Sequence, residues 1–183
     1  MLPQICEINS ESADPKSKFK GGNFVYIDIS SVENGTGQVS FENQISIDEA
    51  PSRARRIVQN DDVIISTVRP NLKAFALLQS LPDRVIASTG FAVLRAKSNI
   101  DPHYLYLTIF TDAIVEQMTA RMGKGSYPSI NENDLKQIKV PLPQLKIQKQ
   151  LVTEAKKEEK IMAFNRQLII LMENKIEIII SGI

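Results

Sequence analysis

The chain has 183 residues, a formal net charge of +1, 43% apolar residues and a single cysteine, Cys6. This length suits one domain with an appendage, and one cysteine excludes an internal disulfide. The N-terminus lacks the pattern of a signal peptide, and the apolar runs near the C-terminus are too short to cross a bilayer, so the sequence predicts a soluble cytoplasmic protein without a membrane partner.

Residues 1–143 are predicted to form an α+β domain built on a mixed or antiparallel sheet. Residues 1–22 are polar and are predicted to be loosely structured. β-branched and aromatic residues, with turn residues at the boundaries, predict strands or short sheet segments at 24–29, 63–68, 74–78, 85–87 and 91–94.

Helices are predicted next along the chain. Asp101 and Pro102 open one that runs to about residue 121, because Asp is a good N-cap and Pro is favoured in the first turn. A short helix over 131–137 and a last strand over 138–141 complete the predicted domain.

Residues 144–183 form a second predicted unit, a single long helix. No proline or glycine occurs from Gln144 to Ile180, and a helix of that length would span about 55 Å. An apolar stripe, interrupted by the charged segment 156–160, contains Ile147, Leu151, Ile161, Leu168, Met172 and Ile179. Such a stripe favours a coiled coil, in an oligomer or with a second copy of the unit, over a helix folded back on its own domain.

Charge is distributed unevenly along the chain. No Lys or Arg occurs from Ile27 to Ser52, whereas three arginines follow within the next four residues. This polarity predicts one acidic and one basic face, and ordinary solvated charge accounts for it equally well.

Residue sets for catalysis are missing from the sequence. His103 is the only histidine, so every Ser–His or Cys–His arrangement would depend on it. The segment Gly123–Ser126 lacks the spacing and the preceding strand of a phosphate-binding loop, and no Cys/His metal set or adenine-methyltransferase motif occurs. We therefore expect a protein that is not an enzyme and that holds no metal and no cofactor.

Three stretches together resemble the target-recognition domain of type I restriction–modification specificity subunits. They are 26–32, then 49–56 and 61–70 with 88–94, and finally 125–130 with 140–148, which contains the pattern PLP-x-x-x-x-Q from Pro141 to Gln148. The resemblance extends from about residue 24 to the end of the chain. It implies recognition of one half of a bipartite duplex DNA target, with adenine methylation and restriction performed by partner modification and restriction subunits.

The family usually carries two such units in tandem, joined by two antiparallel helices, and this chain has one. The resemblance therefore implies a homodimer or pairing with a second recognition repeat.

Candidate DNA-binding residues follow from the chemistry of the duplex. Planar bidentate donors on loops read base edges, and positive charge, hydroxyls and backbone N–H groups bind phosphates. The candidates are Arg53, Arg55, Arg56, Arg69, Asn71, Lys73, Lys124, Ser126 and Tyr127. A salt bridge from one of the first three to Glu49 or Asp61 is the structural alternative.

A function of a different class also fits the sequence. The chain could serve as a coiled-coil adaptor that scaffolds or inhibits a methyltransferase without contacting DNA, and the acidic stretch and near-neutral total charge slightly favour it. The mass of the protein in solution, together with its DNA affinity, distinguishes the two functions.

Overall fold

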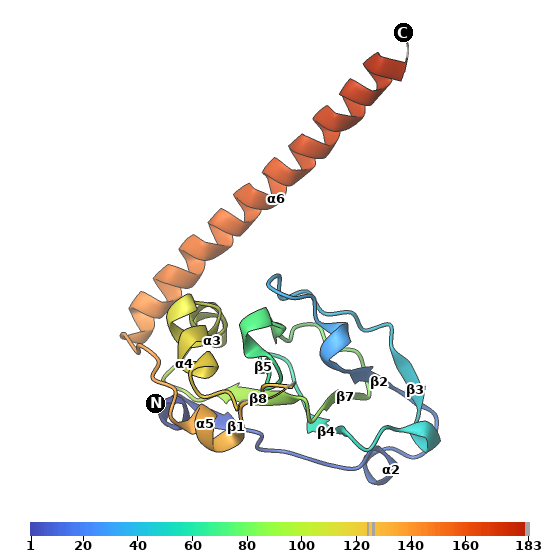
Figure 1. Cartoon of the computed structure of the whole chain (residues 1–183), viewed down its shortest axis with the longest axis vertical. Coiled ribbons are helices and arrows are strands. Elements are labelled where there is room, and N and C mark those ends of the chain that lie inside the picture. The colour runs from blue at the N-terminus through green and yellow to red at the C-terminus, as the bar shows by residue number, and fades with distance from the viewer. Residues whose placement is uncertain (124, 126, 182–183) are drawn as a thin grey trace.

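The computed structural model describes residues 1–123, residue 125 and residues 127–181. Two four-stranded sheets form the body of the domain, and the long helix α6 (Leu145–Ser181) leaves it at one side (Figure 1). The α+β architecture with a long C-terminal helix is thereby confirmed. In the described part of the chain, no helix has the length and apolar composition that a membrane span requires.

The first sheet is antiparallel and has the order β1-β8-β5-β6. Its strands are β1 (Cys6–Ile8), β8 (Phe91–Ala96), β5 (Val63–Ser66) and β6 (Phe75–Leu77). The central strand β5 is covered on both faces, as its continuous apolar run suggests. Val63 and Ile65 pack towards the helices, whereas Ile64 packs towards the second sheet.

The second sheet is mixed and has the order β3-β2-β7-β4. Its strands are β3 (Gln44–Ser46), β2 (Asn23–Ile27), β7 (Val85–Ser88) and β4 (Ala54–Ile57), with β2 and β7 parallel. The segment 54–57 was not expected to be a strand. It pairs with β7 through an irregular register between Ala54 and Arg56, so tertiary pairing outweighs the charged sequence.

The predicted helix over 101–121 is in fact two helices, α3 (Pro102–Ile109) and α4 (Asp112–Thr119). Thr111 lies between them in an extended conformation, and its hydroxyl donates to the carbonyl of Thr108 at 2.7 Å. Such a side-chain bond to the backbone competes with helix continuation. Asn131 caps α5 (Glu132–Lys136). The predicted strand over 138–141 is wrong, because this segment lies outside both sheets; Ile138 is buried there and its carbonyl accepts from the Leu2 N–H.

The expectation that residues 1–22 are loosely structured is also wrong. They contain α1 (Leu2–Ile5), β1 and α2 (Pro15–Lys18), and Leu2, Ile5 and Cys6 are at most 2% exposed. The few apolar residues of this polar stretch complete the core beneath α3 and α4. Burial raises the pKa of the Cys6 thiol to about 12, as expected for a packed cysteine and not a nucleophile.

A partly buried ion pair joins two neighbouring strands. Arg95 on β8 donates from Nε and Nη2 to the two carboxylate oxygens of Asp62, each at 3.0 Å, and Asp62 has a side chain only 1% exposed. Glu11 contacts the same guanidinium from the other side. The two carboxylates thereby satisfy a cation that is 19% exposed.

Replacing Arg95 with Met should destabilise the domain by about 3 kcal/mol, because it leaves the Asp62 carboxylate buried without its cation. Urea unfolding followed by circular dichroism measures the loss. Lys16→Met is the control, since Lys16 and Asp48 lie 4.0 Å apart with side chains 60% and 93% exposed. Equal midpoints for Arg95→Met and wild type would show that the buried pair contributes nothing.

Helix α6 packs on the domain only near its start. In its described length from 145 to 181, Gln148 and Val152 are the two buried residues. All six residues of the predicted stripe are exposed, by 43% at Ile147 and Leu151 and by 47–66% at Leu168, Met172, Ile161 and Ile179. The helix thus presents a large apolar surface beyond its own domain, and the coiled coil remains a prediction.

Candidate nucleic-acid interface

Four segments meet at one end of the two sheets through their backbones. The Thr89 N–H donates to the Arg53 carbonyl at 2.8 Å, and the Thr67 N–H and hydroxyl both donate to the Gly90 carbonyl at 2.9 Å. Val68 and Ser129 form an isolated antiparallel bridge. The segments around 53, 67–69, 89–90 and 127–130 therefore form one surface, which we call the loop junction.

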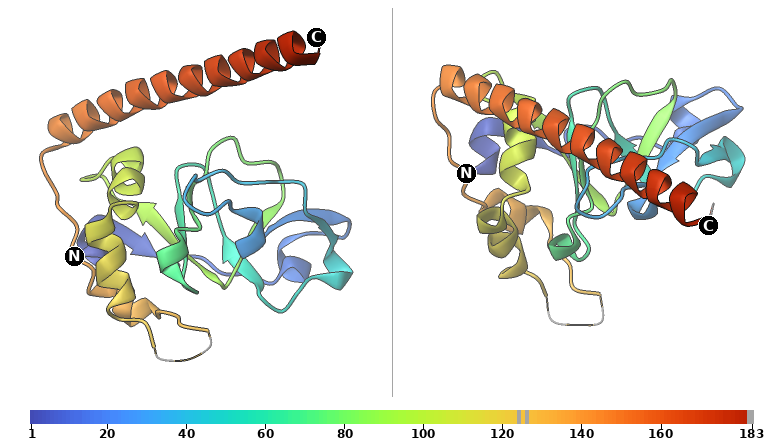
Figure 2. Two further views of the ribbon diagram at one scale, coloured as in Figure 1. Left: turned by 45° about the horizontal axis from the view of Figure 1, so that its top comes forward. Right: turned by 90° about the horizontal axis from the view of Figure 1, so that it is seen from above.

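Arg69 and Tyr127 project from the loop junction as an aromatic–cation pair. The Arg69 guanidinium carbon lies 5.6 Å from the centre of the Tyr127 ring, and the ring is 79% exposed. The Arg69 N–H donates to the Pro128 carbonyl at 2.9 Å, which joins the two loops. In Figure 2 the segment 127–130 lies on the opposite side of the domain from α6.

The backbone at Arg69 is held in the left-handed region, with φ 47°. This conformation is unfavourable for residues with a side chain and persists where surrounding structure imposes it, often at binding sites. Pro70 follows directly and is buried at the start of the short helix η3 (Pro70–Leu72). Arg69 is exposed although the neighbouring Pro70 is buried.

Asn71 and Lys73 lie on the same turn and differ in their surroundings. Asn71 is exposed. The Lys73 ammonium lies 2.8 Å from a carboxylate oxygen of Asp112 at the start of α4, and this hydrogen bond holds the pKa of the Asp112 carboxyl below its ordinary value. This ion pair thereby connects the turn to helix α4.

The three arginines 53, 55 and 56 divide between loop and strand. Arg53 is exposed at the loop junction, whereas Arg55 and Arg56 belong to β4 and are half-buried. Arg55 pairs with Asp14 at 3.0 Å and not with Glu49 or Asp61.

Arg56 is the most enclosed of the three. Burial lowers its pKa, an effect that the Glu132 carboxylate opposes. Within the described residues, its Nε atom is buried without a hydrogen-bond partner. Of the three arginines, Arg53 is therefore the best placed to meet a ligand in the observed conformation.

Two of the predicted DNA-binding residues, Lys124 and Ser126, lie outside the described residues. The structure adds Thr89 and Ser129, which are exposed at the loop junction and carry hydroxyls that can bind phosphate oxygens. Both lie in segments that the family resemblance covers, 88–94 and 125–130. Their proximity to Arg53 and Arg69 depends on pairings across more than 30 residues, which no local pattern predicts.

The acidic stretch lies around the other sheet edge and partly serves the fold. Asp28 caps the short helix η1 (Ile29–Ser31) and accepts hydrogen bonds from Ser30 and Ser31. Asp48 and Glu49 lie on η2 (Ile47–Glu49), which follows the edge strand β3. Asp48 and Glu49 follow the end of β3 that pairs with the start of β2, so they lie at the opposite end of this sheet from the loop junction. Asp28 lies at the same end as the loop junction, because β2 and β7 are parallel and Ile29 approaches Gly90.

Comparison with known sequences matches the chain to specificity subunits of type I restriction systems. The sequence profile of the type I restriction modification DNA specificity domain matches residues 1–179. The type I restriction enzyme EcoDI specificity subunit of Escherichia coli is 24% identical over 149 residues, or 81% of this chain and 32% of that subunit.

Solved structures show the same likeness. The HsdS subunit from Thermoanaerobacter tengcongensis has a TM-score of 0.80 and 34% identity, covering 91% of this chain and 43% of that one. A chain from a study of complex assembly and conformational transition of the type I R-M system has a TM-score of 0.79, 35% identity and the same coverage. This chain thus spans less than half the length of each of these relatives.

Proposed function

Because the chain belongs to the family of type I restriction–modification DNA specificity domains, we propose that it recognises one half of a bipartite duplex DNA target and directs partner subunits to it. The domain performs no chemistry of its own. Methyl transfer to adenine belongs to the modification subunit and cleavage to the restriction subunit, in the cytoplasm.

The observation that carries this proposal is the loop junction. It gathers Arg53, Arg69 and Tyr127 from three separate segments onto one exposed surface. A guanidinium is suited to bidentate contact with guanine or phosphate, and an exposed aromatic ring to contact with bases or sugars. Rigid strands below position these side chains, as recognition requires.

A second recognition unit completes the proposed assembly. Helix α6 carries an exposed apolar surface that a partner helix can cover, and the related subunits are more than twice as long as this chain. A second copy, or a second recognition repeat, then presents its loops to the other half of the target.

Duplex binding by the chain with its modification subunit tests the proposal. Fluorescence anisotropy should show affinity that falls linearly on a log–log plot against salt, with a slope of about −0.9 for each phosphate contacted. Affinity that is equal for every duplex at every salt concentration would overturn it. A helix-mediated dimer without DNA affinity, even with its partner, would instead favour the adaptor function.

Intrinsic fluorescence tests whether Tyr127 lies at the DNA. The chain has four tyrosines and no tryptophan. Tyr26 and Tyr104 are buried, Tyr106 is half-buried, and only Tyr127 of the four is fully exposed. Adding duplex should therefore lower the tyrosine emission through Tyr127, since contact with bases quenches an aromatic fluorophore.

Tyr127→Phe should abolish that decrease, whereas Tyr106→Phe should preserve it. The phenylalanine retains the ring that faces Arg69, so affinity should change little. A decrease of unchanged size in Tyr127→Phe would place Tyr127 away from the duplex.

A further inference from the structure

The side chain of Gln148, in the first turn of α6, is completely buried although it is polar. Val152, one turn later, is the only other buried residue in the described length of the helix. The attachment of a 37-residue helix to its domain therefore depends largely on the segment 148–152, which we call the root of α6. Figure 1 shows α6 leaving the domain from this end.

The Gln148 amide is hydrogen-bonded at both of its polar atoms. Its Oε1 accepts from the Asp101 N–H at 2.8 Å. Its Nε2 donates to the carbonyl of Asn99 at 3.2 Å and to that of Pro143 at 2.8 Å. These three backbone groups belong to the turn before α3 and to the segment before α6, so one side chain joins both.

Asp101 extends this attachment into the domain. Its carboxylate caps α3 by accepting from the N–H groups of His103 and Tyr104, while its own N–H is held by Gln148. Through Gln148 and Asp101, the first turn of α6 is thus hydrogen-bonded to the segment that begins α3. A buried amide satisfied at both ends has one favoured orientation, because any other leaves buried polar groups unpaired at about 1–3 kcal/mol each.

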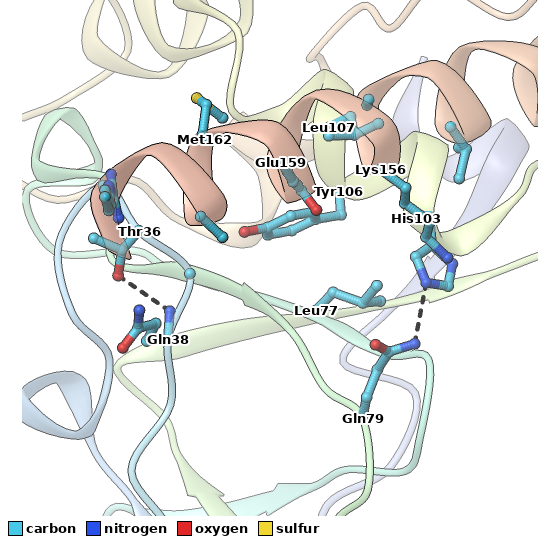
Figure 3. A pocket seen from close by; sticks show the side chains of 16 residues that line it. Thr36, Gln38, Leu77, Gln79, His103, Tyr106, Leu107, Lys156, Glu159 and Met162 are labelled. Atoms are coloured by element: carbon cyan, nitrogen blue, oxygen red, sulfur yellow. Dashed lines mark hydrogen bonds between the residues drawn. The ribbon is translucent and has the colours of Figure 1, made fainter. Parts of the chain in front are cut away.

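Beyond Val152, the helix faces a cleft of about 500 Å³ on the domain side, lined by both polar and apolar side chains. Tyr106 of α3, Glu159 of α6 and the turn around Gly37 line it (Figure 3). The space next to the Gly37 backbone is taken by the Tyr106 hydroxyl. The helix is therefore supported here by half-buried and exposed groups, and the buried contacts remain those of the root.

From this geometry we propose that Gln148 is a positioning residue that fixes the direction of α6 relative to the loop junction. This inference rests on the proposed function, in which the direction of α6 sets the separation between the two half-targets. Gln148 is then a determinant of that separation. A tilt of about 10° would displace the far end of a helix of ~55 Å by about 10 Å. That distance corresponds to about three base pairs of duplex at ~3.4 Å each.

Distances between two spin labels measure this direction without DNA. Cysteines introduced at Glu42 in the domain and Glu177 on α6 are both exposed, whereas Cys6 is buried and unreactive. Dilution with unlabelled protein isolates the distance within one chain. The wild type should give one narrow distance distribution.

Gln148→Met retains the length of the side chain but makes none of its three hydrogen bonds. It should shift or broaden the distance distribution by about 5 Å or more, which is half the displacement that a ~10° tilt produces. Gln144→Met, at an exposed position just before the helix, is the matched control and should match wild type. If Gln148→Met does not fold, Gln148→Glu carries the same test, since it retains the acceptor for the Asp101 N–H and replaces the donor with a carboxylate oxygen that faces the Asn99 and Pro143 carbonyls.

Wild-type distributions in folded Gln148 variants would overturn the positioning role. This outcome is separable from the proposed function, because it requires no DNA. A shifted distribution in a protein that binds no duplex would refute the proposed function alone.

Discussion

Combined replacement of Arg53 and Arg69 by alanine is expected to weaken duplex binding about 100-fold. Both side chains are exposed at the loop junction, and the backbone there joins their loops to each other. A bidentate arginine contact contributes about 1–3 kcal/mol, and ~1.4 kcal/mol corresponds to a tenfold change in affinity. Anisotropy titrations at fixed salt, with the modification subunit present, give the ratio directly.

Arg84→Ala is the matched control for this experiment. Arg84 precedes β7, at the opposite end of that strand from Thr89, and its guanidinium carbon lies 4.9 Å from the centre of the Phe19 ring. It removes one positive charge, as each of the single replacements Arg53→Ala and Arg69→Ala does, and should leave affinity within about threefold, because distant exposed charges are largely screened. A loss in Arg84→Ala equal to that in either single variant would show that net charge, and not the loop junction, governs binding.

Arg55 and Arg56 remain predicted DNA contacts, and their replacement is expected to have a smaller effect. Arg55 already pairs with Asp14, and both side chains are half-buried on β4.

Replacing Leu168 and Met172 with glutamate is expected to abolish pairing between α6 helices. These side chains are 47% and 58% exposed in the single chain, so a partner helix would cover them. Covering an apolar side chain of this size contributes about 1.5–3 kcal/mol, and a buried carboxylate adds a further cost. The association should therefore weaken more than 100-fold.

Sedimentation equilibrium measures this change. The wild type should be dimeric, or paired with a second recognition repeat, at micromolar concentration, and the double variant monomeric. Gln167→Glu adds one charge at an exposed polar position of the same helix and should remain dimeric. The thermal unfolding of the domain should not change, since neither replaced residue contributes to its core. A wild type that stays monomeric with every partner present would contradict the predicted coiled coil.

Much of the fold follows from local pattern. The run Val63–Ile65 and the uninterrupted helix from Leu145 are visible in the sequence because one has continuous β-forming residues and the other lacks any breaker. The errors at residues 1–22 and 54–57 arise where contacts with distant residues determine the local structure. Leu2 and Ile5 are ordered by a core contributed by residues more than 55 positions away, and β4 is a strand because β7 is its neighbour.

The site was predictable in its residue types and not in its arrangement. Arg69 and Tyr127 carry recognisable chemistry in a proline-stiffened context, but backbone pairing between distant segments, through the Val68–Ser129 bridge and the bond from the Arg69 N–H to the Pro128 carbonyl, brings them together. The pair of Asp62 and Arg95 has no local signal in the sequence, because the antiparallel register of β5 and β8 places the two residues side by side. Gln148 occurs in the motif PLP-x-x-x-x-Q, yet its three backbone partners are visible only in the folded chain.

Selection from a pool of random duplexes tests the central claim most directly. The chain with its modification subunit is incubated with the pool at physiological salt, and the bound fraction is amplified and sequenced over several rounds. Recognition of a split target predicts enrichment of a motif in two parts with a spacer of fixed length, and loss of enrichment in the Arg53→Ala, Arg69→Ala protein. A bound pool with the same sequence composition as the starting pool would contradict the claim.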